Sequence, residues 1–183
     1  MTKTLLSFGH GYSARALSRL LLPQDWRIIG TTRSEDKAPR LMNEGIEPRI
    51  WPGADMIPAL NAATHLLISA APGDDGDPVL AVLRDEIAGR AGQFEWVGYL
   101  STTGVYGDHG GGWSDETTPF TPTTTRGKAR VAAEAQWATR NLPPPRNTGA
   151  EAWFAALDTA TAAIRAYGAE ARVVSFGADT FRE

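Results

Sequence analysis

A glycine-rich hexapeptide near the amino terminus has the residue types and the spacing that bind a diphosphate. It reads G-H-G-Y-S-A, a G-x-G-x-x-A pattern at the start of an expected helix. The first glycine allows a tight turn, the second lets the backbone approach a pyrophosphate, and the small alanine lets the helix pack against the preceding strand. Free N–H groups and the positive end of the helix dipole would hold the phosphates. We predict a dinucleotide-binding turn in which the His10 side chain faces solvent, with an ordinary glycine turn as the alternative, from residues Gly9, His10, Gly11, Tyr12, Ser13 and Ala14.

The end of the second expected strand indicates which dinucleotide would bind. Residues 30–34 read G-T-T-R-S, without the Asp or Glu that usually binds the ribose hydroxyls of NAD. Arg33 could instead pair with a 2′-phosphate, with Ser34 as a further donor. The pattern favours NADP, and the alternatives are NAD binding and an arginine that is merely solvated.

Short apolar runs alternate with longer segments of helical period along the chain. The expected strands are residues 5–8, 27–31, 46–51, 66–70, 96–100 and 172–176. The expected helices are residues 12–22, a short helix capped by Ser34 that carries Leu41 and Met42, a helix capped by Asp77, and residues 126–140 and 151–167. Strands that are apolar on both faces and alternate with amphipathic helices predict an α/β fold, a doubly wound parallel sheet between two layers of helices. Ligands bind at the carboxyl ends of such strands.

Length and composition favour one α/β domain over residues 1–183. The chain has 183 residues, a formal net charge of −3 and no cysteine. This composition excludes disulfides and thiolate metal sites, and it offers no basic surface for nucleic acid or an anionic membrane. No apolar run is long enough for a membrane span, so we expect a cytoplasmic protein. The histidines and the acidic loop at residues 73–77 lack metal-ligand spacing, and we predict no metal site.

Motifs around the fourth and fifth expected strands resemble a known family. Residues 100–107 read L-S-T-T-G-V-Y-G, and residues 115–122 read D-E-T-T-P-F-T-P. Together with the end of the fourth strand, they resemble the extended short-chain dehydrogenase/reductases, the NAD-dependent epimerase/dehydratase group, over residues 3–137. The resemblance implies a Rossmann fold and a bound NADP or NAD, in a cleft lined by Ala70, Ala71, Pro72 and Ser101.

The resemblance also implies catalytic residues, and here the chain departs from the family pattern. Thr102 aligns with the Ser or Thr that binds the substrate oxygen in the family. The family's Tyr-x-x-x-Lys aligns with residues 126–130, so Arg126 replaces the tyrosine and Arg130 replaces the lysine. An arginine stays protonated at neutral pH and is a poor acid/base group. Tyr106 is a conceivable substitute, with a packed aromatic as the alternative, and the two arginines could bind an anion or form a solvated helix face.

Two classes of function remain open from the sequence. The chain could be an atypical NAD(P)-dependent oxidoreductase or epimerase with Thr102 and Tyr106 as catalytic residues. Its substrate would then be a small molecule, sugar-like or nucleotide-sugar-like. The rival is a non-catalytic dinucleotide-binding protein that senses the cofactor or supports a partner. A hydrolase is disfavoured because the sequence has no G-x-S-x-G motif.

The last part of the chain does not match the family. Residues 141–183 align with none of its motifs, and most of the expected substrate domain is missing. We expect either a divergent tail or a truncated or frame-shifted fragment. A homodimer and a monomer both remain open.

Overall fold

Five parallel strands form one sheet in the part of the chain that the computed structural model describes, residues 2–115 and 117–138. The strands are β1 (Thr4–Phe8), β2 (Arg27–Thr32), β3 (Glu47–Ile50), β4 (His65–Ile68) and β5 (Trp96–Tyr99). Their order is β3-β2-β1-β4-β5, and every neighbouring pair is parallel. The chain runs outward from β1 to β3, crosses to the other side of β1 and continues to β5. This is the doubly wound, Rossmann-like α/β arrangement predicted from the sequence.

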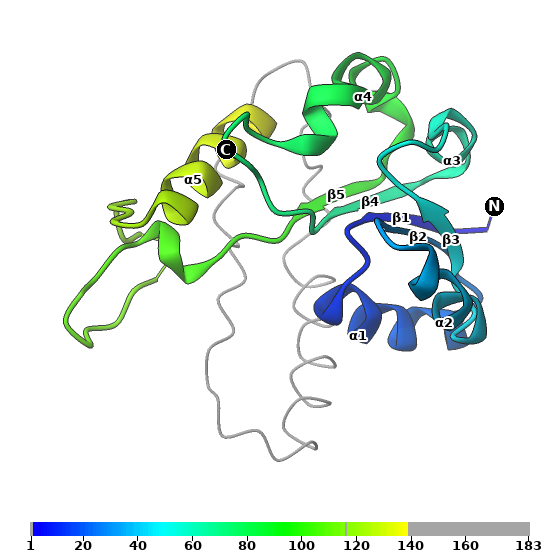
Figure 1. Ribbon diagram of the computed structural model, residues 1–183, viewed down its shortest axis with the longest axis horizontal. Coiled ribbons are helices and arrows are strands. Elements are labelled where there is room, and N and C mark those ends of the chain that lie inside the picture. Colours follow the sequence, from blue (N-terminus) through cyan, green and yellow to red (C-terminus); the bar gives the residue numbers. More distant parts are fainter. Residues whose placement is uncertain (1, 116, 139–183) are drawn as a thin grey trace.

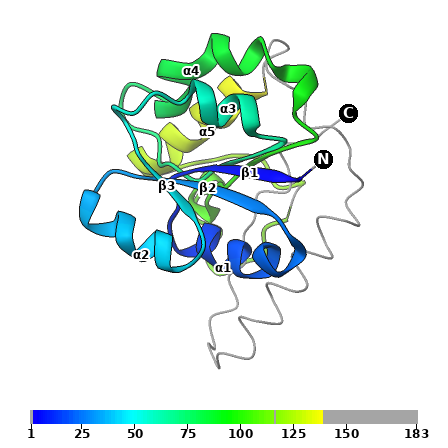
Figure 2. The same ribbon diagram turned by 90° about the vertical axis from the view of Figure 1, so that its right-hand side faces the viewer.

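The helices lie in two layers, one on each face of the sheet (Figures 1 and 2). One face is covered by α1 (Tyr12–Leu21) and α2 (Ala38–Asn43). The other is covered by α3 (Ile57–Ala62), α4 (Pro78–Ala88) and α5 (Thr125–Trp137). Because crossovers between parallel strands are right-handed, the change of direction after β3 moves the later helices to the opposite face. None of the helices in the described ranges is long and apolar enough to cross a membrane.

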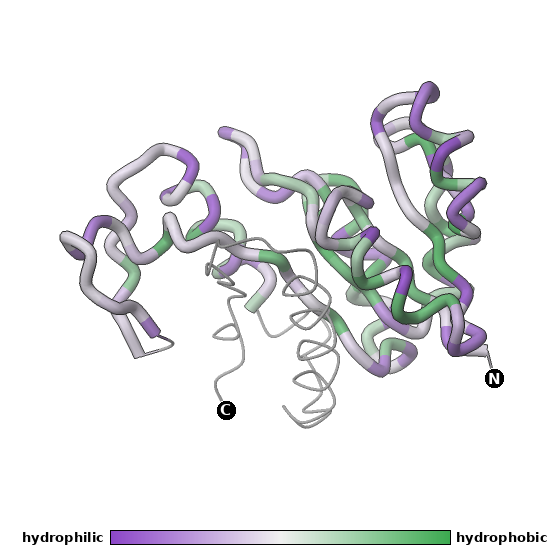
Figure 3. Tube along the Cα trace, turned by 90° about the horizontal axis from the view of Figure 1, so that it is seen from below, coloured by the Kyte–Doolittle hydropathy of each residue, from purple (hydrophilic) through white to green (hydrophobic). Residues whose placement is uncertain are grey.

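Alternation along the strands divides the apolar core between the two faces. Leu5 and Ile28 pack in a cluster with residues of α1 and α2. Their neighbours Leu6 and Ile29 belong to a second cluster, which residues of α3, α4 and α5 complete. Figure 3 shows hydrophobic residues mostly along the inner segments of the trace and hydrophilic residues mostly at its periphery. A sheet buried on both faces explains why the strands read as nearly continuous apolar runs.

Local signals set the start of α4 as predicted. Asp77 is its N-cap, and the Asp77 carboxylate accepts the N–H groups of Val79 and Leu80 at 2.9 Å each. Pro78 occupies the first helical position, where it gives up no intrahelical hydrogen bond. This cap fixes where the loop after β4 ends.

The predicted helix capped by Ser34 is wrong in detail. Residues Glu35–Lys37 form a 3₁₀ turn, α2 begins only at Ala38, and the Ser34 side chain makes no capping hydrogen bond. Of the two apolar residues that this helix was expected to carry, Leu41 is buried and Met42 is exposed. The expected strand at residues 172–176 and helix at residues 151–167 lie outside the described residues.

Candidate functional site

The carboxyl ends of four neighbouring strands bring the predicted site residues to one edge of the sheet. Phe8 of β1 pairs with Ile68 of β4, which pairs with Tyr99 of β5. On the other side of β1, β2 ends at Thr32. The segments that follow these strands begin at Gly9, Arg33, Ser69 and Leu100. Ligands bind doubly wound sheets at this edge, between the strands where the winding direction changes, here β1 and β4.

The turn after β1 is wedged between the ends of β2 and β4. Gly9 has a φ of +78°, and a Cβ there would lie 2.7 Å from the backbone nitrogen of Ala70. The Gly9 N–H donates to the Thr31 hydroxyl at 2.8 Å. The His10 N–H donates to the Thr31 carbonyl at 2.9 Å. Because a positive φ and so close a backbone favour a residue without a side chain, Gly9 has the predicted tight-turn role.

An uncapped helix amino terminus follows this turn. Gly11 is the N-cap of α1, so no side chain bonds the N–H groups of the first turn, and no acidic residue lies in that turn. A Cβ at Gly11 would come near only the Gly9 carbonyl oxygen, at 3.7 Å. Tyr12 and Ser13 are exposed, whereas Ala14 is fully buried and packs close to the sheet as predicted. This geometry fits a diphosphate, since first-turn N–H groups and the helix dipole attract anions.

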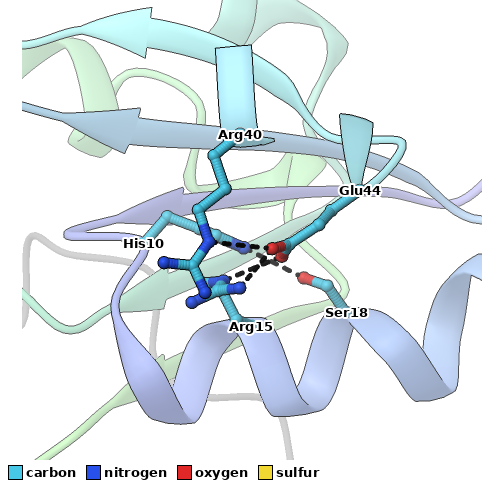
Figure 4. A network of polar contacts seen from close by, with 5 residues as sticks. All are labelled: His10, Arg15, Ser18, Arg40 and Glu44. Carbon is cyan, nitrogen blue, oxygen red and sulfur yellow. Dashed lines mark hydrogen bonds and ion pairs between the residues drawn. The ribbon is translucent and has the colours of Figure 1, made fainter. Parts of the chain in front are cut away.

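The His10 side chain is buried, so the expectation that it faces solvent is wrong. Only 6% of the residue is exposed. Its ring lies over the backbone of β2, where a Cβ on Gly30 would be 2.7 Å from His10 Cγ. Its Nε2 lies 3.2 Å from the Ser18 hydroxyl of α1 (Figure 4). Burial, with a smaller contribution from the Arg15 cation, lowers the pKa of His10 to about 4, so the imidazole is neutral at pH 7.

Ion pairs beside His10 tie α1 to the end of α2 (Figure 4). Arg15 donates to the Glu44 carboxylate from Nε at 2.8 Å and also from Nη2. Arg40 Nε lies 3.4 Å from the same carboxylate. The hydrogen bond from Arg15 lowers the pKa of Glu44 and keeps it charged. These contacts hold the first turns of α1 against the segment that follows β2.

The turn after β2 presents a cation at the same edge. Arg33 is exposed and directly follows the last residue of the strand. The Thr32 hydroxyl accepts the Ser34 N–H at 3.3 Å and stabilises the turn. The next acidic residue, Glu35, belongs to the following 3₁₀ turn. Arg33 is therefore accessible to a phosphate group, as its predicted role requires.

The loop after β4 carries three residues predicted to line the cofactor cleft. Ala70 packs against the core next to the turn after β1, Ala71 is exposed, and Pro72 is half-buried. At the end of this loop, Gln136 of α5 accepts the Asp77 N–H at 3.2 Å. The loop is thus held between the β1–α1 turn and α5, at the edge of the sheet where the cofactor cleft is predicted.

Two hydroxyl residues at the end of β5 are held by hydrogen bonds within the protein. Ser101 donates to the carboxylate of Glu134, a buried residue of α5. The Thr102 hydroxyl accepts the Gly104 N–H at 3.3 Å and caps the short 3₁₀ turn after the strand. A Cβ at Gly127 would lie 2.4 Å from the Gly104 carbonyl oxygen, so α5 packs directly on this turn. Both hydroxyl residues remain half-buried, at the edge where a ligand would bind.

The arginines at the family's tyrosine and lysine positions have different surroundings. Arg126 is exposed in the first turn of α5, whereas Arg130 is half-buried. Arg130 donates to the Leu100 carbonyl at 3.0 Å and to the Tyr99 hydroxyl at 3.1 Å. Its guanidinium carbon also lies 5.4 Å from the centroid of the Tyr99 ring. The interpretation as a solvated helix face holds for Arg126 and is wrong for Arg130, which is bonded to the end of β5.

Tyr99 and Tyr106, at and after the end of β5, are packed. Tyr106 is 7% exposed, and its ring centroid lies 5.6 Å from that of Phe120. Its backbone carbonyl accepts hydrogen bonds from the Thr121 hydroxyl and from His109 Nε2. This packing favours the structural interpretation of Tyr106 over an acid/base role. Burial also raises the pKa of Tyr99 to about 12, so its phenol stays protonated at neutral pH.

Several residues that position the site were not identified from the sequence. Gly30 and Thr31 receive the β1–α1 turn, and Glu134 and Gln136 bind the segments after β5 and β4. A signal existed for Gly30, because a glycine inside a strand often marks a close approach of another segment. The other contacts join residues far apart in the chain, and no local pattern indicates them.

Comparisons with known proteins find similar structures but no matching family model. No protein-family model matches the chain, and no curated protein matches it. A structure of a functionally unknown conserved protein from Silicibacter pomeroyi DSS is 63% identical, with a TM-score of 0.73 over 78% of this chain and 51% of that chain. A Methylobacillus flagellatus structure assigned as an NAD-dependent epimerase/dehydratase is 27% identical, with a TM-score of 0.55 over 75% and 50%. The Bordetella bronchiseptica enzyme WbmG in complex with NAD is 20% identical, with a TM-score of 0.53 over 74% and 49%.

These structural neighbours include NAD-dependent epimerase/dehydratase and short-chain dehydrogenase/reductase-type proteins. The chain shares their Rossmann-like fold. It spans about half the length of the structures that it matches. The similarity covers about three quarters of this chain.

Proposed function

We propose that the chain binds a nicotinamide dinucleotide at the turn between β1 and α1, with NADP preferred to NAD. The proposal rests on the amino terminus of α1, which follows the Gly9 turn and has no side-chain cap, and on the open space next to the Gly11 Cα. The pyrophosphate would accept first-turn N–H groups and gain from the helix dipole. Ser101 and the loop after β4 would flank the rest of the molecule. Similarity to a structure assigned as an NAD-dependent epimerase/dehydratase supports the choice of dinucleotide.

Replacing Gly11 by valine separates ligand binding from folding. Gly11 has φ −93° and ψ −152°, extended backbone that any residue adopts, and a Cβ there has room. The valine methyl groups would fill the space that a pyrophosphate must enter. In calorimetric titrations we expect wild type to bind NADP and Gly11→Val to bind at least about tenfold more weakly, a loss of about 1.4 kcal/mol. The matched control is Gly92→Ala, because a Cβ at Gly92 meets nothing within 4 Å.

Two results would end this proposal. The first is a wild-type chain that binds neither NADP nor NAD. The second is an unchanged affinity in Gly11→Val, which would place the ligand elsewhere. Urea denaturation of each variant shows whether a loss of binding reflects a loss of fold.

The preference for NADP depends on Arg33. A charge-assisted hydrogen bond to the 2′-phosphate is worth about 1.5–3 kcal/mol, so Arg33→Gln should weaken NADP binding about 10- to 100-fold. NAD lacks this phosphate, and its affinity should not change. The control is Arg19→Gln, at an exposed arginine in the last turn of α1. Tighter binding of NAD than of NADP by wild type would reject the role of Arg33.

For the chemistry, we propose an atypical oxidoreductase or epimerase that acts on a sugar-like or nucleotide-sugar-like small molecule. A bound nicotinamide ring would supply hydride transfer. Thr102, half-buried at the end of β5, would bind the reacting oxygen. Arg130, held by the Leu100 carbonyl, would supply the fixed cation at the family's lysine position. Tyr106 is packed against Phe120 and is not part of this proposal.

A non-catalytic dinucleotide-binding protein is the second candidate. It is favoured by the residues at positions 126 and 130, because both are arginines, a residue type that is a poor acid/base group. Two assays discriminate the candidates: NADPH oxidation with a panel of carbonyl compounds, and product analysis of nucleotide sugars for epimerisation, which consumes no NADPH overall. Turnover that falls in Thr102→Val but not in the exposed neighbour variant Thr103→Val supports the enzyme. Dinucleotide binding without turnover on any substrate supports the second candidate.

A further inference from the structure

We propose that the neutral imidazole of His10 locks the turn between β1 and α1 onto β2, and that protonating it releases the turn together with any dinucleotide held there. His10 is in this view a positioning residue, since its side chain faces the protein and not the ligand. The part that concerns the dinucleotide rests on the proposed function. The lock itself concerns this chain alone and can be tested without a ligand.

Consecutive residues of the turn fit against one short stretch of β2. The Gly9 N–H reaches the Thr31 hydroxyl at 2.8 Å, and the His10 N–H reaches the Thr31 carbonyl at 2.9 Å. The His10 ring then fills the space above Gly30, where a Cβ would lie 2.7–3.0 Å from ring and side-chain atoms. A glycine in the strand and a buried ring in the turn are therefore complementary. The position of the turn depends on both.

The hydrogen bonds of Ser18 define the tautomer of the ring. The Ser18 hydroxyl has one hydrogen, which it donates to the Ala14 carbonyl at 3.0 Å. Its oxygen must therefore accept the hydrogen bond from His10 Nε2, at 3.2 Å. Nε2 carries the proton, and Nδ1 is the nitrogen with the lone pair. In the described part of the chain this Nδ1 is buried and has no hydrogen-bond partner. A second proton would bring a positive charge and an N–H group to a place without an acceptor.

The charged groups around the His10 ring do not offset the cost of adding a second proton to it. Arg15 disfavours a second cation, whereas Glu44 favours one but is already paired with Arg15 and Arg40 (Figure 4). From β2 the ring meets Gly30, and the His10 N–H meets the Thr31 carbonyl; neither residue titrates. Burial has the largest effect, and it lowers the pKa of His10 to about 4. The ring therefore accepts a proton readily only when the turn has opened.

Proton linkage sets the size of the effect. An open turn exposes the imidazole at its ordinary pKa of 6.5, whereas the closed turn holds it at about 4. Acid favours the form that binds more protons, which is the open one. The ratio of open to closed turns should rise about 30-fold between pH 8 and pH 5. A dinucleotide that binds only the closed turn should therefore lose affinity as the pH falls.

Nitrogen-15 NMR of the histidine rings tests the lock in the wild-type chain without a ligand. We expect His10 at pH 7 to be neutral, with the proton on Nε2, and to titrate well below pH 6.5. His109 is the internal control, because it is exposed. A His10 ring that titrates near pH 6.5, or that carries its proton on Nδ1, would overturn the proposal. This measurement needs no variant.

Amide hydrogen exchange tests whether the proton opens the turn. The amides to follow are those of Gly9 and His10, which donate to Thr31. After correction for intrinsic exchange, their protection should fall about 30-fold from pH 8 to pH 5 in wild type and in His109→Gln. It should stay constant in His10→Gln, whose longer amide can place an N–H donor near the position of Nε2 but does not titrate. An equal fall in His10→Gln would show that another group is responsible.

Calorimetric titration with NAD at pH 8 and pH 5 tests whether protonation of His10 weakens dinucleotide binding. NAD is the better probe because the 2′-phosphate of NADP itself has a pKa near 6. We expect NAD to bind more weakly at pH 5 in wild type and equally at both pH values in His10→Gln. The same pH dependence in both chains would overturn the coupling to the ligand. If wild type binds neither NAD nor NADP at pH 8, the proposed function fails, while the NMR and exchange results still decide the lock.

Discussion

Replacing Gly30 by alanine tests how closely β2 and the turn after β1 are packed. The new methyl carbon would lie 2.7 Å from Cγ and 3.0 Å from Cβ and Nδ1 of His10. Carbon atoms in contact prefer a separation of about 3.5–4.0 Å, so the ring or the strand would have to move by roughly 1 Å. The ring cannot move freely, because the His10 backbone is bonded to Thr31 and its Nε2 to Ser18.

The expected magnitude follows from two opposing effects. Overpacking of a buried site costs about 1–3 kcal/mol. Alanine in place of glycine inside a strand would otherwise gain about 0.5–1 kcal/mol. We expect Gly30→Ala to lower the free energy of unfolding by about 0.5–2 kcal/mol, the difference between these effects. Since His10→Ala removes the obstructing ring, alanine at position 30 should be neutral or stabilising in the double variant.

Urea denaturation of wild type, the two single variants and the double variant measures this coupling. We expect a coupling energy of about 1–3 kcal/mol between the two positions. Gly92→Ala is the control, because a Cβ there meets nothing within 4 Å, and it should change stability by less than about 0.5 kcal/mol. A Gly30→Ala chain as stable as wild type, with no coupling to His10→Ala, would refute the packing of the ring over β2.

Three further substitutions probe other contacts at this edge. Gly9→Ala forces an L-residue to a φ of +78°, with its Cβ 2.7 Å from the nitrogen of Ala70. Thermal unfolding should show that the free energy of unfolding falls by more than about 2 kcal/mol. A fall of less than about 0.5 kcal/mol would contradict the close approach. Asp77→Ala removes the N-cap of α4, and urea denaturation should show a loss of about 1 kcal/mol that is absent in the exposed control Asp75→Ala. Glu44→Gln breaks the ion pair from Arg15 of α1 to the end of α2, and the pair with Arg40 of α2 itself. It should cost up to about 1 kcal/mol at low salt and less at high salt, whereas a loss independent of salt would contradict an electrostatic role.

Local patterns were sufficient to predict the elements of the sheet. Each of the five strands in the described ranges lies within two residues of its prediction. Apolar runs, and the residues that interrupt them, are properties of a few neighbouring positions. The start of α4 was predicted for the same reason, since Asp77 and Pro78 act on the adjoining turn. Ser34 is the exception, because a 3₁₀ turn separates it from α2.

Side-chain environments at the site could not be predicted in this way. The pattern around His10 contains no sign of Gly30, which lies in the next strand and creates the space for the ring. The sequence around Arg130 is compatible with a solvated helix face. In the structure, the Leu100 carbonyl and the Tyr99 hydroxyl at the end of β5 accept hydrogen bonds from Arg130. In both cases the deciding partner is at least twenty residues away in the chain.

The sequence by itself determined the parallel sheet, the glycine turn at residues 9–14 and the absence of an acid at the end of β2. Each of these depends on residue type and near-neighbour spacing, which the chain carries before it folds. Only the tertiary structure decided that His10 is buried and neutral, and that Arg33 is exposed while Arg130 is half-buried and bonded to the end of β5. Burial and pairing arise between segments that folding brings together, so their effects on charge and accessibility exist only in the assembled sheet.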